Sequence, residues 1–549
     1  MRTRLERTTG GARAWAGPLA VFALLAVLHT WPLATDTATL SRNDNGDTQL
    51  NEWIVSWIAH QLPRAPLRLF DANIFFPEPR ALAFSEPLLV PALLGAPIRW
   101  TGGSPVLTYN LLLLAGFFVT GLAAFHVAVA WTGDRLAGLL AGSLLAFNAV
   151  TLSRLPHLQA HWAPFLPLAL LALERVIVTG GWRSTAALGL CVALLTATSG
   201  YWAALVVVVL ALAFVARLGS WWQQRGLVLG RLGLAAALAV VLAAPILVPY
   251  WRAHREQGLT RSLDEAASFS STPASYLSTP ARLHHSTWSQ PFYGGSGGSY
   301  FPGLVGLGLA VAAMAAPAAW RDVRRRTLVL VAAAGFLLSL GPATPLYVAL
   351  HYAFPPMRGL RDPSRFGYLV LLAVALLAAL GLRALRERLP GRRGTLAAVL
   401  LVVMANAEAL CAPIAFVPFE GFSPVYDRLA RETPRTALAE FPLHPPAQIY
   451  LNAGYVLAST AHWTPLVNGY SGFTPPSFVE RSEVLRHFPD EAAIRLLHEL
   501  GVSHVVVHLD RYRSPRRERI ADLLASRVEF DLVETGPEGE RLYRLREAD

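Results

Sequence analysis

Three acidic side chains lie close together near the start of the chain, where they could remove a proton or bind a cation. Asp44 and Asp47 are separated by two residues, and Glu52 follows five positions after Asp47. A carboxylate in such a group can act as a general base or as a metal ligand. We predict that Asp47 is the base, because it begins a stretch with helical spacing that would hold it in place. The alternatives are that Asp47 is only the N-cap of that helix, or that these acids belong to a solvated loop.

The stretch after Asp47 predicts an amphipathic helix. Its apolar positions at helical spacing are Leu50, Trp53, Ile54, Trp57 and Ile58. A stripe that contains two tryptophans is typical of a helix lying in the membrane interface. A second apolar segment, 87–100, is short and interrupted by two prolines, so we predict that it is re-entrant or interfacial. Glu86, directly before it, either caps that segment or faces the same cavity as Asp47.

A second polar group contains His157, Gln159 and His161, next to Trp162. Two histidines four positions apart could bind a metal ion, but no cysteine or further histidine accompanies them. We therefore predict that both imidazoles and Gln159 donate hydrogen bonds to a bound polar group. Packing beside Trp162 in the interface is the alternative.

Three arginines, Arg358, Arg361 and Arg365, lie in a loop that we place outside the cytoplasm. This placement opposes the positive-inside trend and requires a compensating group. Phosphate suits the planar guanidinium fork, so we predict that Arg361 or Arg365 faces a phosphate. A local ion pair with Asp362 is the alternative.

Two further segments carry groups suited to a substrate. His462, Asn468 and Tyr470 lie in a polar and aromatic stretch, 459–473, that either binds a sugar or forms an ordinary packed loop. The glycine-rich stretch 293–303 is either a loop that orders over a substrate or a plain linker.

The elements that must position these residues are mainly membrane-spanning helices. Of the residues, 54% are hydrophobic and 15% are charged, against about 25% charged in soluble proteins. Both cysteines, Cys191 and Cys411, fall in apolar runs, so no disulfide framework is indicated. We predict eleven spans, the first an uncleaved helix: 14–34, 106–130, 136–152, 162–179, 184–199, 201–217, 230–250, 302–319, 327–341, 366–384 and 395–414.

Arginine placement sets the predicted orientation, since basic residues near helix ends stay in the cytoplasm. The sequence has no lysine, and its net charge is +11. With the N-terminus inside, every inner segment is basic, beginning with Arg2, Arg4, Arg7 and Arg13 and including the run Arg324–Arg326. Eleven spans then place the C-terminus and the long loop 35–104 outside.

Beyond the helices, the sequence predicts a small mixed α/β domain over residues 417–549, after a transmembrane domain over 1–416. The expected strands are 437–441, 502–508, 529–534 and 541–545. The expected helices are 424–433, 490–500 and 513–526.

Together, these features resemble the GT-C superfamily of membrane glycosyltransferases, which includes oligosaccharyltransferases and the aminoarabinose transferase acting on lipid A. The resemblance covers the bundle: a first span, a long outer loop with acids and interfacial helices, many further spans and an outer C-terminal domain. More narrowly, four motifs resemble poorly characterised bacterial GT-C-like proteins of the YfhO type. The motifs are Gly46-Asp47, His157-Leu-Gln159, Leu360-Arg-Asp-Pro-Ser-Arg365-Phe and Asn468-Gly-Tyr-Ser-Gly. The paired acidic dipeptide of the superfamily is missing, because Asn45-Gly46 separates Asp44 from Asp47.

The resemblance implies a multi-pass protein of the bacterial cytoplasmic membrane. It would transfer a sugar, with inversion, from a polyprenyl-phosphate carrier to an extracytoplasmic glycan, lipid or protein. An aspartate would deprotonate the acceptor while basic groups stabilise the departing phosphate. A divalent cation is the one cofactor left open, and no nucleic-acid partner is expected.

A non-catalytic transporter or scaffold in envelope polysaccharide assembly is the alternative function. Transporters usually carry ionisable residues at mid-membrane and internal repeats. Here the middles of the spans are almost purely Ala, Leu and Val, and we find no repeat, which favours an enzyme.

Overall fold

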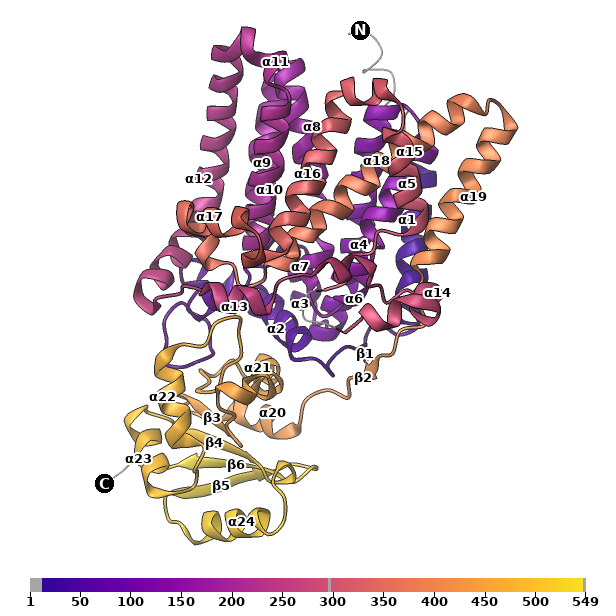
Figure 1. Cartoon of the computed structure of the whole chain (residues 1–549). Helices are drawn as coiled ribbons and strands as arrows, with labels where there is room; N and C mark the ends of the chain where they lie inside the picture. The colour runs from indigo at the N-terminus through magenta and orange to yellow at the C-terminus, as the bar shows by residue number, and fades with distance from the viewer. Residues whose placement is uncertain (1–11, 295–297, 547–549) are drawn as a thin grey trace. The chain divides into compact units, whose positions relative to one another are not determined.

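The computed structural model describes residues 12–294 and 298–546 and is mainly helical (Figure 1). Arg2, Arg4, Arg7 and part of the glycine-rich stretch lie outside the described residues. The chain forms two compact units. Unit 1 comprises Met1–Asp36, Leu111–Leu247 and Thr260–Ala415, and unit 2 comprises Thr37–Asn110, Val248–Leu259 and Phe416–Asp549.

A helix occupies each of the eleven predicted spans. These helices are α1 (Ala12–His29), α4 (Pro105–Thr132), α5 (Arg135–Ala146), α8 (Phe165–Val178), α9 (Trp182–Thr198), α10 (Gly200–Ala216), α12 (Arg225–Gln257), α15 (Leu304–Met314), α16 (Val323–Ser339), α18 (Tyr368–Arg388) and α19 (Arg392–Ala409). Shorter helices connect them: α6 (Ala149–Ser153), α7 (Leu158–His161), α11 (Leu218–Trp221), α13 (Leu263–Ser268), α14 (Arg282–His284) and α17 (Pro345–Ala353).

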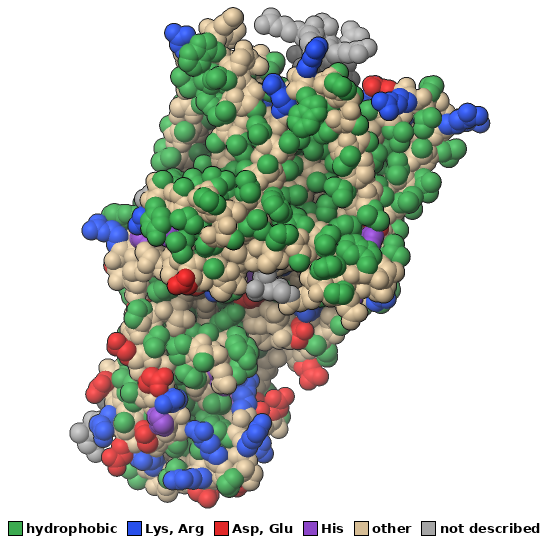
Figure 2. All heavy atoms as spheres, viewed as in Figure 1, with side chains coloured by type: hydrophobic (Ala, Val, Ile, Leu, Met, Phe, Trp, Pro, Cys, Tyr) green, Lys and Arg blue, Asp and Glu red, His purple; other side chains and the backbone are tan. Residues whose placement is uncertain are grey.

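The chain is a helical, multi-pass membrane protein. Among the described residues, four helical stretches are long and apolar enough to cross a bilayer: Pro105–Thr132, Arg135–Ser153, Leu218–Gln257 and Pro363–Arg388. Shorter apolar helices accompany them. Figure 2 shows hydrophobic side chains over the visible sides of the helices, with acidic and basic side chains gathered mainly at helix ends and on the C-terminal α/β domain.

Ion pairs join the ends of unit 1 helices that the sequence places in the cytoplasm. Glu174, near the end of α8, accepts hydrogen bonds from Arg217 (3.2 Å) after α10 and from Nε of Arg324 (3.0 Å) at the start of α16. Asp134 caps α5 and pairs with Arg386 of α18. Because buried charges require partners, these pairs fix the relative positions of the helix ends. They agree with the predicted alternation of the helices within unit 1.

Unit 2 combines the long first loop with the C-terminal segment, a pairing that the sequence did not indicate. Strand β1 (Leu40–Ser41) pairs antiparallel with β2 (Val417–Pro418). Helix α2 (Gly46–Gln61) packs against α3 (Leu89–Trp100) and α21 (Ala453–Ala458). The division of the chain near residue 416 into two folding units stays a prediction.

The interfacial position predicted for the first of these helices is wrong. Residues 50–59 of α2 are all buried, so protein encloses the helix on every side. The reason lies in its tryptophans, whose N–H groups find protein acceptors. Trp53 donates to the side chain of Asn73 (3.2 Å), and Trp57 donates to the carbonyl of Leu69 (2.8 Å). By contrast, α3 is a single 12-residue helix, too short to cross a bilayer, as predicted.

The C-terminal part of unit 2 is the predicted mixed α/β domain. Its sheet has the order β3-β4-β6-β5, in which β3 and β4 are parallel and the other pairs are antiparallel. The strands are β3 (Leu438–Phe441), β4 (His504–His508), β5 (Phe530–Thr535) and β6 (Glu540–Leu545). The helices are α20 (Pro424–Arg431), α22 (Pro476–Leu485), α23 (Glu491–Glu499) and α24 (Arg516–Ser526). All four predicted strands and all three predicted helices are confirmed, whereas α21 and α22 were not predicted.

Candidate functional site

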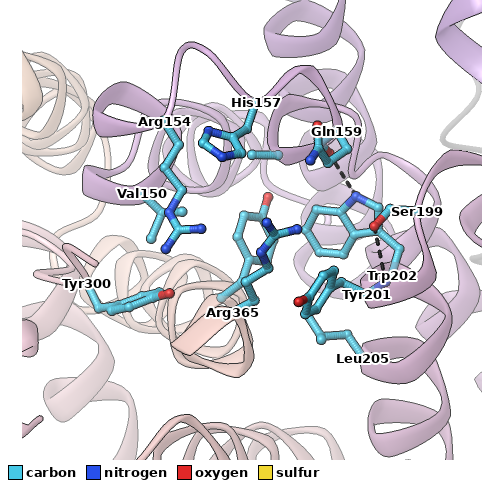
Figure 3. A pocket seen from close by; sticks show the side chains of 12 residues that line it. Val150, Arg154, His157, Gln159, Ser199, Tyr201, Trp202, Leu205, Tyr300 and Arg365 are labelled. Atoms are coloured by element: carbon cyan, nitrogen blue, oxygen red, sulfur yellow. Dashed lines mark hydrogen bonds between the residues drawn. The ribbon is translucent and has the colours of Figure 1, made fainter. Parts of the chain in front are cut away.

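A small cavity of about 40 Å³ lies in unit 1, between the segments around α6 and α7, the start of α10 and the turn Pro363–Gly367. Figure 3 shows the side chains of Arg154 and Arg365 pointing into it from two segments far apart in sequence. The lining residues are Val150, Arg154, His157, Gln159, Ala160, Ser199, Tyr201, Trp202, Leu205, Tyr300, Arg365 and Tyr368. The cavity therefore combines cationic groups with apolar and aromatic walls.

One carboxylate holds both arginines of the cavity. An Oδ2–N distance of 3.0 Å joins Asp362 to Arg154, and one of 3.1 Å joins it to Arg365. Burial alone would raise the pKa of Asp362, but the two guanidinium groups outweigh it and lower the pKa to about 2. Asp362 is thus an anion at neutral pH. These three groups carry two positive charges and one negative charge, which leaves a surplus of one positive charge at the cavity.

Hydroxyl groups complete the positioning of these charges. The Tyr201 hydroxyl accepts hydrogen bonds from the backbone N–H groups of Arg361 (3.1 Å) and Asp362 (2.9 Å). The Arg365 guanidinium lies 3.9 Å above the ring of Tyr201, a favourable cation–π distance. Arg154 also donates to Ser364 (3.3 Å). The arginines are therefore held in place before any ligand binds, which reduces the entropy cost of binding.

Of four residues predicted to face a ligand, three line this cavity and one does not. His157, Gln159 and Arg365 line it. The side-chain oxygen of Gln159 is buried and has no hydrogen-bond partner within the described residues, so it can accept a bond from a ligand. Arg361 does not line the cavity, because its guanidinium lies 4.8 Å above the ring of Phe269. Of the two arginines predicted to face a phosphate, Arg365 lines the cavity and also makes the ion pair with Asp362 that was the alternative. Its contact with a phosphate stays a prediction.

The predicted ligand contact of His161 is wrong. Its two ring nitrogens lie 3.2 Å from the His157 carbonyl and 2.9 Å from the Thr151 carbonyl. Burial lowers the pKa of His161 to about 4, so the ring is neutral. It fixes the path of the chain between α6 and α7 and presents no nitrogen to the cavity.

Sequence reasoning missed Arg154, Tyr201 and Tyr300. Arg154 carried a usable signal, since it is an arginine at the predicted outer end of a span, like Arg365. The two tyrosines carried none, because aromatic residues are common at membrane interfaces.

The three candidate acids belong to unit 2, where Asn45 rather than Asp47 caps α2. The Asn45 side chain accepts from the backbone N–H of Asp47 (2.9 Å), so the N-cap alternative for Asp47 is wrong. Asp47 is the second residue of the helix and half-buried, and its Oδ1 accepts a hydrogen bond from the Tyr470 hydroxyl (2.8 Å).

The other two acids have different surroundings. Asp44 is exposed and pairs with Arg42 (3.0 Å). Glu52 is 1% exposed, and its burial raises its pKa to about 8 in spite of a hydrogen bond from Asn43. Both Asp47 and Glu52 act electrostatically on Tyr109, so these two acids lie close to one side chain. Asp47 and Asp44 are thus both accessible, but Asp47 is held by a neutral hydroxyl and Asp44 by an arginine.

Burial of a protonated Glu52 predicts a pH-dependent gain of stability on substitution. Because the folded state raises the pKa of Glu52 from 4.5 to about 8, its unfavourable contribution is absent below about pH 4. It grows as the pH rises toward about 8. We expect Glu52→Gln to raise the melting temperature by a few degrees at pH 8 and by much less at pH 4, measured by differential scanning fluorimetry of the purified protein. An equal shift at both values would contradict the assigned protonation state.

Three further predicted residues lie in unit 2. Glu86 does not cap α3, whose N-cap position is Leu88 without a side-chain hydrogen bond, and its other predicted role, in the same cavity as Asp47, stays a prediction. Asn468 is fully buried and exchanges two 2.8 Å hydrogen bonds with the backbone of Glu440. His462 is buried and accepts from the backbone N–H of Thr464 (3.0 Å). The ligand contact predicted for Asn468 is therefore wrong, since its amide joins β3 to the loop beside it. The ring Nε2 of His462 is buried and has no hydrogen-bond partner among the described residues, so the ligand contact of His462 stays a prediction.

The described residues contain no group of three or more His, Cys, Asp or Glu side chains arranged to hold a metal ion. His157 and His161 do not form a metal site in this arrangement, because both ring nitrogens of His161 lie within hydrogen-bond distance of backbone carbonyls.

Comparisons with known proteins place the fold. No protein-family model matches the sequence, and no curated protein matches it. Two solved structures are similar over nearly the whole chain. The oligosaccharyltransferase of Archaeoglobus fulgidus, tethered to an acceptor peptide, has a TM-score of 0.51 and 15% identity over 98% of this chain and 74% of its own. ArnT of Cupriavidus metallidurans, bound to undecaprenyl phosphate, has a TM-score of 0.51 and 14% identity over 97% of this chain and 98% of its own. Both are GT-C membrane glycosyltransferases, and this chain has the GT-C fold.

Proposed function

We propose that the protein is a membrane glycosyltransferase that moves a sugar from a polyprenyl-phosphate carrier to an acceptor outside the cytoplasm. The observation that carries the proposal is the cavity of unit 1, where the two positive charges of Arg154 and Arg365 exceed the single negative charge of Asp362. Its surplus positive charge suits a phosphate, and its apolar walls suit the adjoining chain of a lipid. The ArnT structure, with the same fold, binds undecaprenyl phosphate, which is consistent with this ligand class.

In the proposed reaction, an acceptor hydroxyl attacks the anomeric carbon of the donor sugar with inversion. Its proton passes to a carboxylate base as the new glycosidic bond forms. The bond between the anomeric carbon and the phosphate oxygen breaks, and the bonding electrons remain on the phosphate. Arg154 and Arg365 stabilise that charge, which is larger in the transition state than in the donor.

Mass spectrometry of lipid carriers and envelope glycans from a strain lacking the protein tests this function. We expect a polyprenyl-phosphate sugar to accumulate and one sugar modification of the envelope to disappear. Complementation by the wild type should reverse both changes. Normal glycosylation combined with failed export of a polymer would support the transporter or scaffold alternative instead.

The same proposal includes an orientation in the cytoplasmic membrane, with the long first loop and the C-terminus outside. It rests on the arginine asymmetry of the sequence. In a cysteine-free variant, we expect Leu67→Cys and Leu532→Cys to react with an impermeant maleimide on intact cells, and Arg326→Cys to be protected. All three side chains are exposed, so burial does not explain protection. Labelling at position 326 alone would show that the protein has the opposite orientation in the membrane.

A further inference from the structure

Two polar side chains on the wall of the unit 1 cavity carry hydrogen-bonding groups that no described residue satisfies. Gln159 is 6% exposed and Tyr368 is 3% exposed, and both line the cavity. The side-chain oxygen of Gln159 and the hydroxyl of Tyr368 have no hydrogen-bond partner within the described residues. Because buried polar groups are nearly always paired, these two groups indicate a ligand that can form hydrogen bonds with both.

Trp202 holds these two side chains on the same part of the wall. Its indole N–H donates to the backbone carbonyl of Gln159 (2.8 Å; Figure 3). Its ring meets the ring of Tyr368 edge to face, with 4.7 Å between the ring centroids. Tyr368 also follows Arg365 by three positions, where the turn Pro363–Gly367 leads into α18, and residues at this spacing share a face. Gln159 and Tyr368 therefore lie beside the arginine that we assign to the carrier phosphate.

The group that Gln159 requires is a hydrogen-bond donor. An amide oxygen only accepts hydrogen bonds, whereas a tyrosine hydroxyl can also donate one. The phosphate of a lipid-linked sugar is a diester and carries no O–H, so it can accept from Tyr368 but cannot donate to Gln159. The O–H must then come from the sugar. Its hydroxyl nearest to the phosphate is the one on C2, next to the anomeric carbon.

The volume of the cavity limits which substituent can enter beside the phosphate. The cavity measures about 40 Å³, roughly three times the space that one water molecule requires. A hydroxyl fits this space next to phosphate oxygens, but a bulkier acetamido group does not. The rest of the sugar ring has to remain at the mouth of the cavity.

We propose that Gln159 and Tyr368 select a donor sugar with a free 2-hydroxyl, which rests on the proposed function because Arg154 and Arg365 then hold the carrier phosphate. The 2-hydroxyl donates to the side-chain oxygen of Gln159 and accepts from the Tyr368 hydroxyl. The substrate class is therefore a polyprenyl-phosphate hexose, such as glucose or mannose, and not a 2-deoxy or 2-acetamido sugar.

Equilibrium binding of matched sugar lipids tests this selection without any transfer reaction. Undecaprenyl-phosphate glucose, its mannose epimer and the 2-deoxy compound common to both compete with labelled undecaprenyl phosphate for the purified full-length protein in nanodiscs. The 2-deoxy lipid leaves the buried oxygen of Gln159 unpaired, so we expect the better of the two 2-hydroxyl lipids to bind about 5- to 150-fold more tightly. The corresponding 2-acetamido lipid should bind no better than the 2-deoxy lipid.

Two variants and a matched control assign this preference to the two side chains. Gln159→Met keeps the length of the side chain and removes the acceptor, so the affinity ratio between 2-hydroxyl and 2-deoxy lipids should fall to about one. Tyr368→Phe removes only a hydroxyl and should reduce the same ratio. Tyr347→Phe is the control, because Tyr347 also has a buried hydroxyl without a partner among the described residues but does not line the cavity. It should leave the ratio unchanged.

Equal affinity of the wild type for 2-hydroxyl and 2-deoxy lipids would overturn the selection and leave the proposed function intact. A preference for the 2-acetamido lipid, or one that survives Gln159→Met, would overturn it in the same way. If Gln159→Met weakened undecaprenyl phosphate as much as the 2-hydroxyl lipids, Gln159 would bind a protonated phosphate oxygen, and the selection would again be wrong. Failure of undecaprenyl phosphate and of every sugar lipid to bind would contradict the proposed function, and the selection with it.

Discussion

Replacing Asp47 by asparagine is expected to lower sugar transfer by about 10²–10⁴-fold, the range for loss of a general base. Asparagine keeps the size of the side chain and can still accept the hydrogen bond that Tyr470 donates to Oδ1. It removes the basicity, however, so expression and donor binding should persist while turnover falls. The measurement is transfer of a labelled sugar from its polyprenyl-phosphate carrier by the purified, reconstituted protein.

Two matched variants separate chemistry from structure in this experiment. Glu52→Gln changes a buried neighbouring acid and should leave transfer within a few-fold of wild type. Tyr470→Phe removes the hydroxyl that orients Asp47, and a positioning role predicts a smaller loss that appears mainly in kcat. Near-normal transfer by Asp47→Asn would end the assignment, and Asp44 would become the next candidate base.

Much of the fold could be predicted, because its signals are local. The run His-Val-Val-Val-His of β4 shows β-branched residues bounded by a turn, and α18 is a continuous apolar stretch that ends in arginines. Such patterns depend on a residue and its immediate neighbours. The orientation of the bundle in the membrane, inferred from the arginines, stays a prediction.

The site was harder to predict, because its residues are defined by distant partners. Arg154 depends on Asp362, 208 positions away, and no local pattern shows that pair. Asn468 looked like a sugar ligand, but its amide matches the backbone of a strand 28 positions earlier. The stripe of α2 had the composition of an interfacial helix, yet a loop that returns over it supplies acceptors for both of its tryptophans. Composition cannot distinguish lipid from protein as the environment of an apolar stripe.

Arg365→Ala is expected to weaken carrier binding by about 1.5–3 kcal/mol, the range for a hydrogen bond to a charged group. That loss corresponds to about 10- to 150-fold in Kd. Arg365 lines the cavity and lies 3.1 Å from Asp362, so its removal cancels the surplus positive charge. Lysine should restore binding only in part, since it lacks the bidentate fork. The measurement is the affinity of the purified protein for undecaprenyl phosphate, with undecaprenol as the ligand that lacks the phosphate.

Arg361→Ala is the matched control, because it removes an arginine only four positions away whose guanidinium lies over Phe269 outside the cavity. It should leave affinity within about twofold of wild type and show that the effect of Arg365 is not a general loss of positive charge. Arg154→Ala should resemble Arg365→Ala, since both arginines share Asp362. Equal losses of affinity in all three variants would indicate that the ligand phosphate is attracted by the overall positive charge of this region and not by a contact with the cavity arginines. Unchanged affinity in both cavity variants would leave Arg154 and Arg365 as structural partners of Asp362 and would remove the main support for a carrier phosphate at this site.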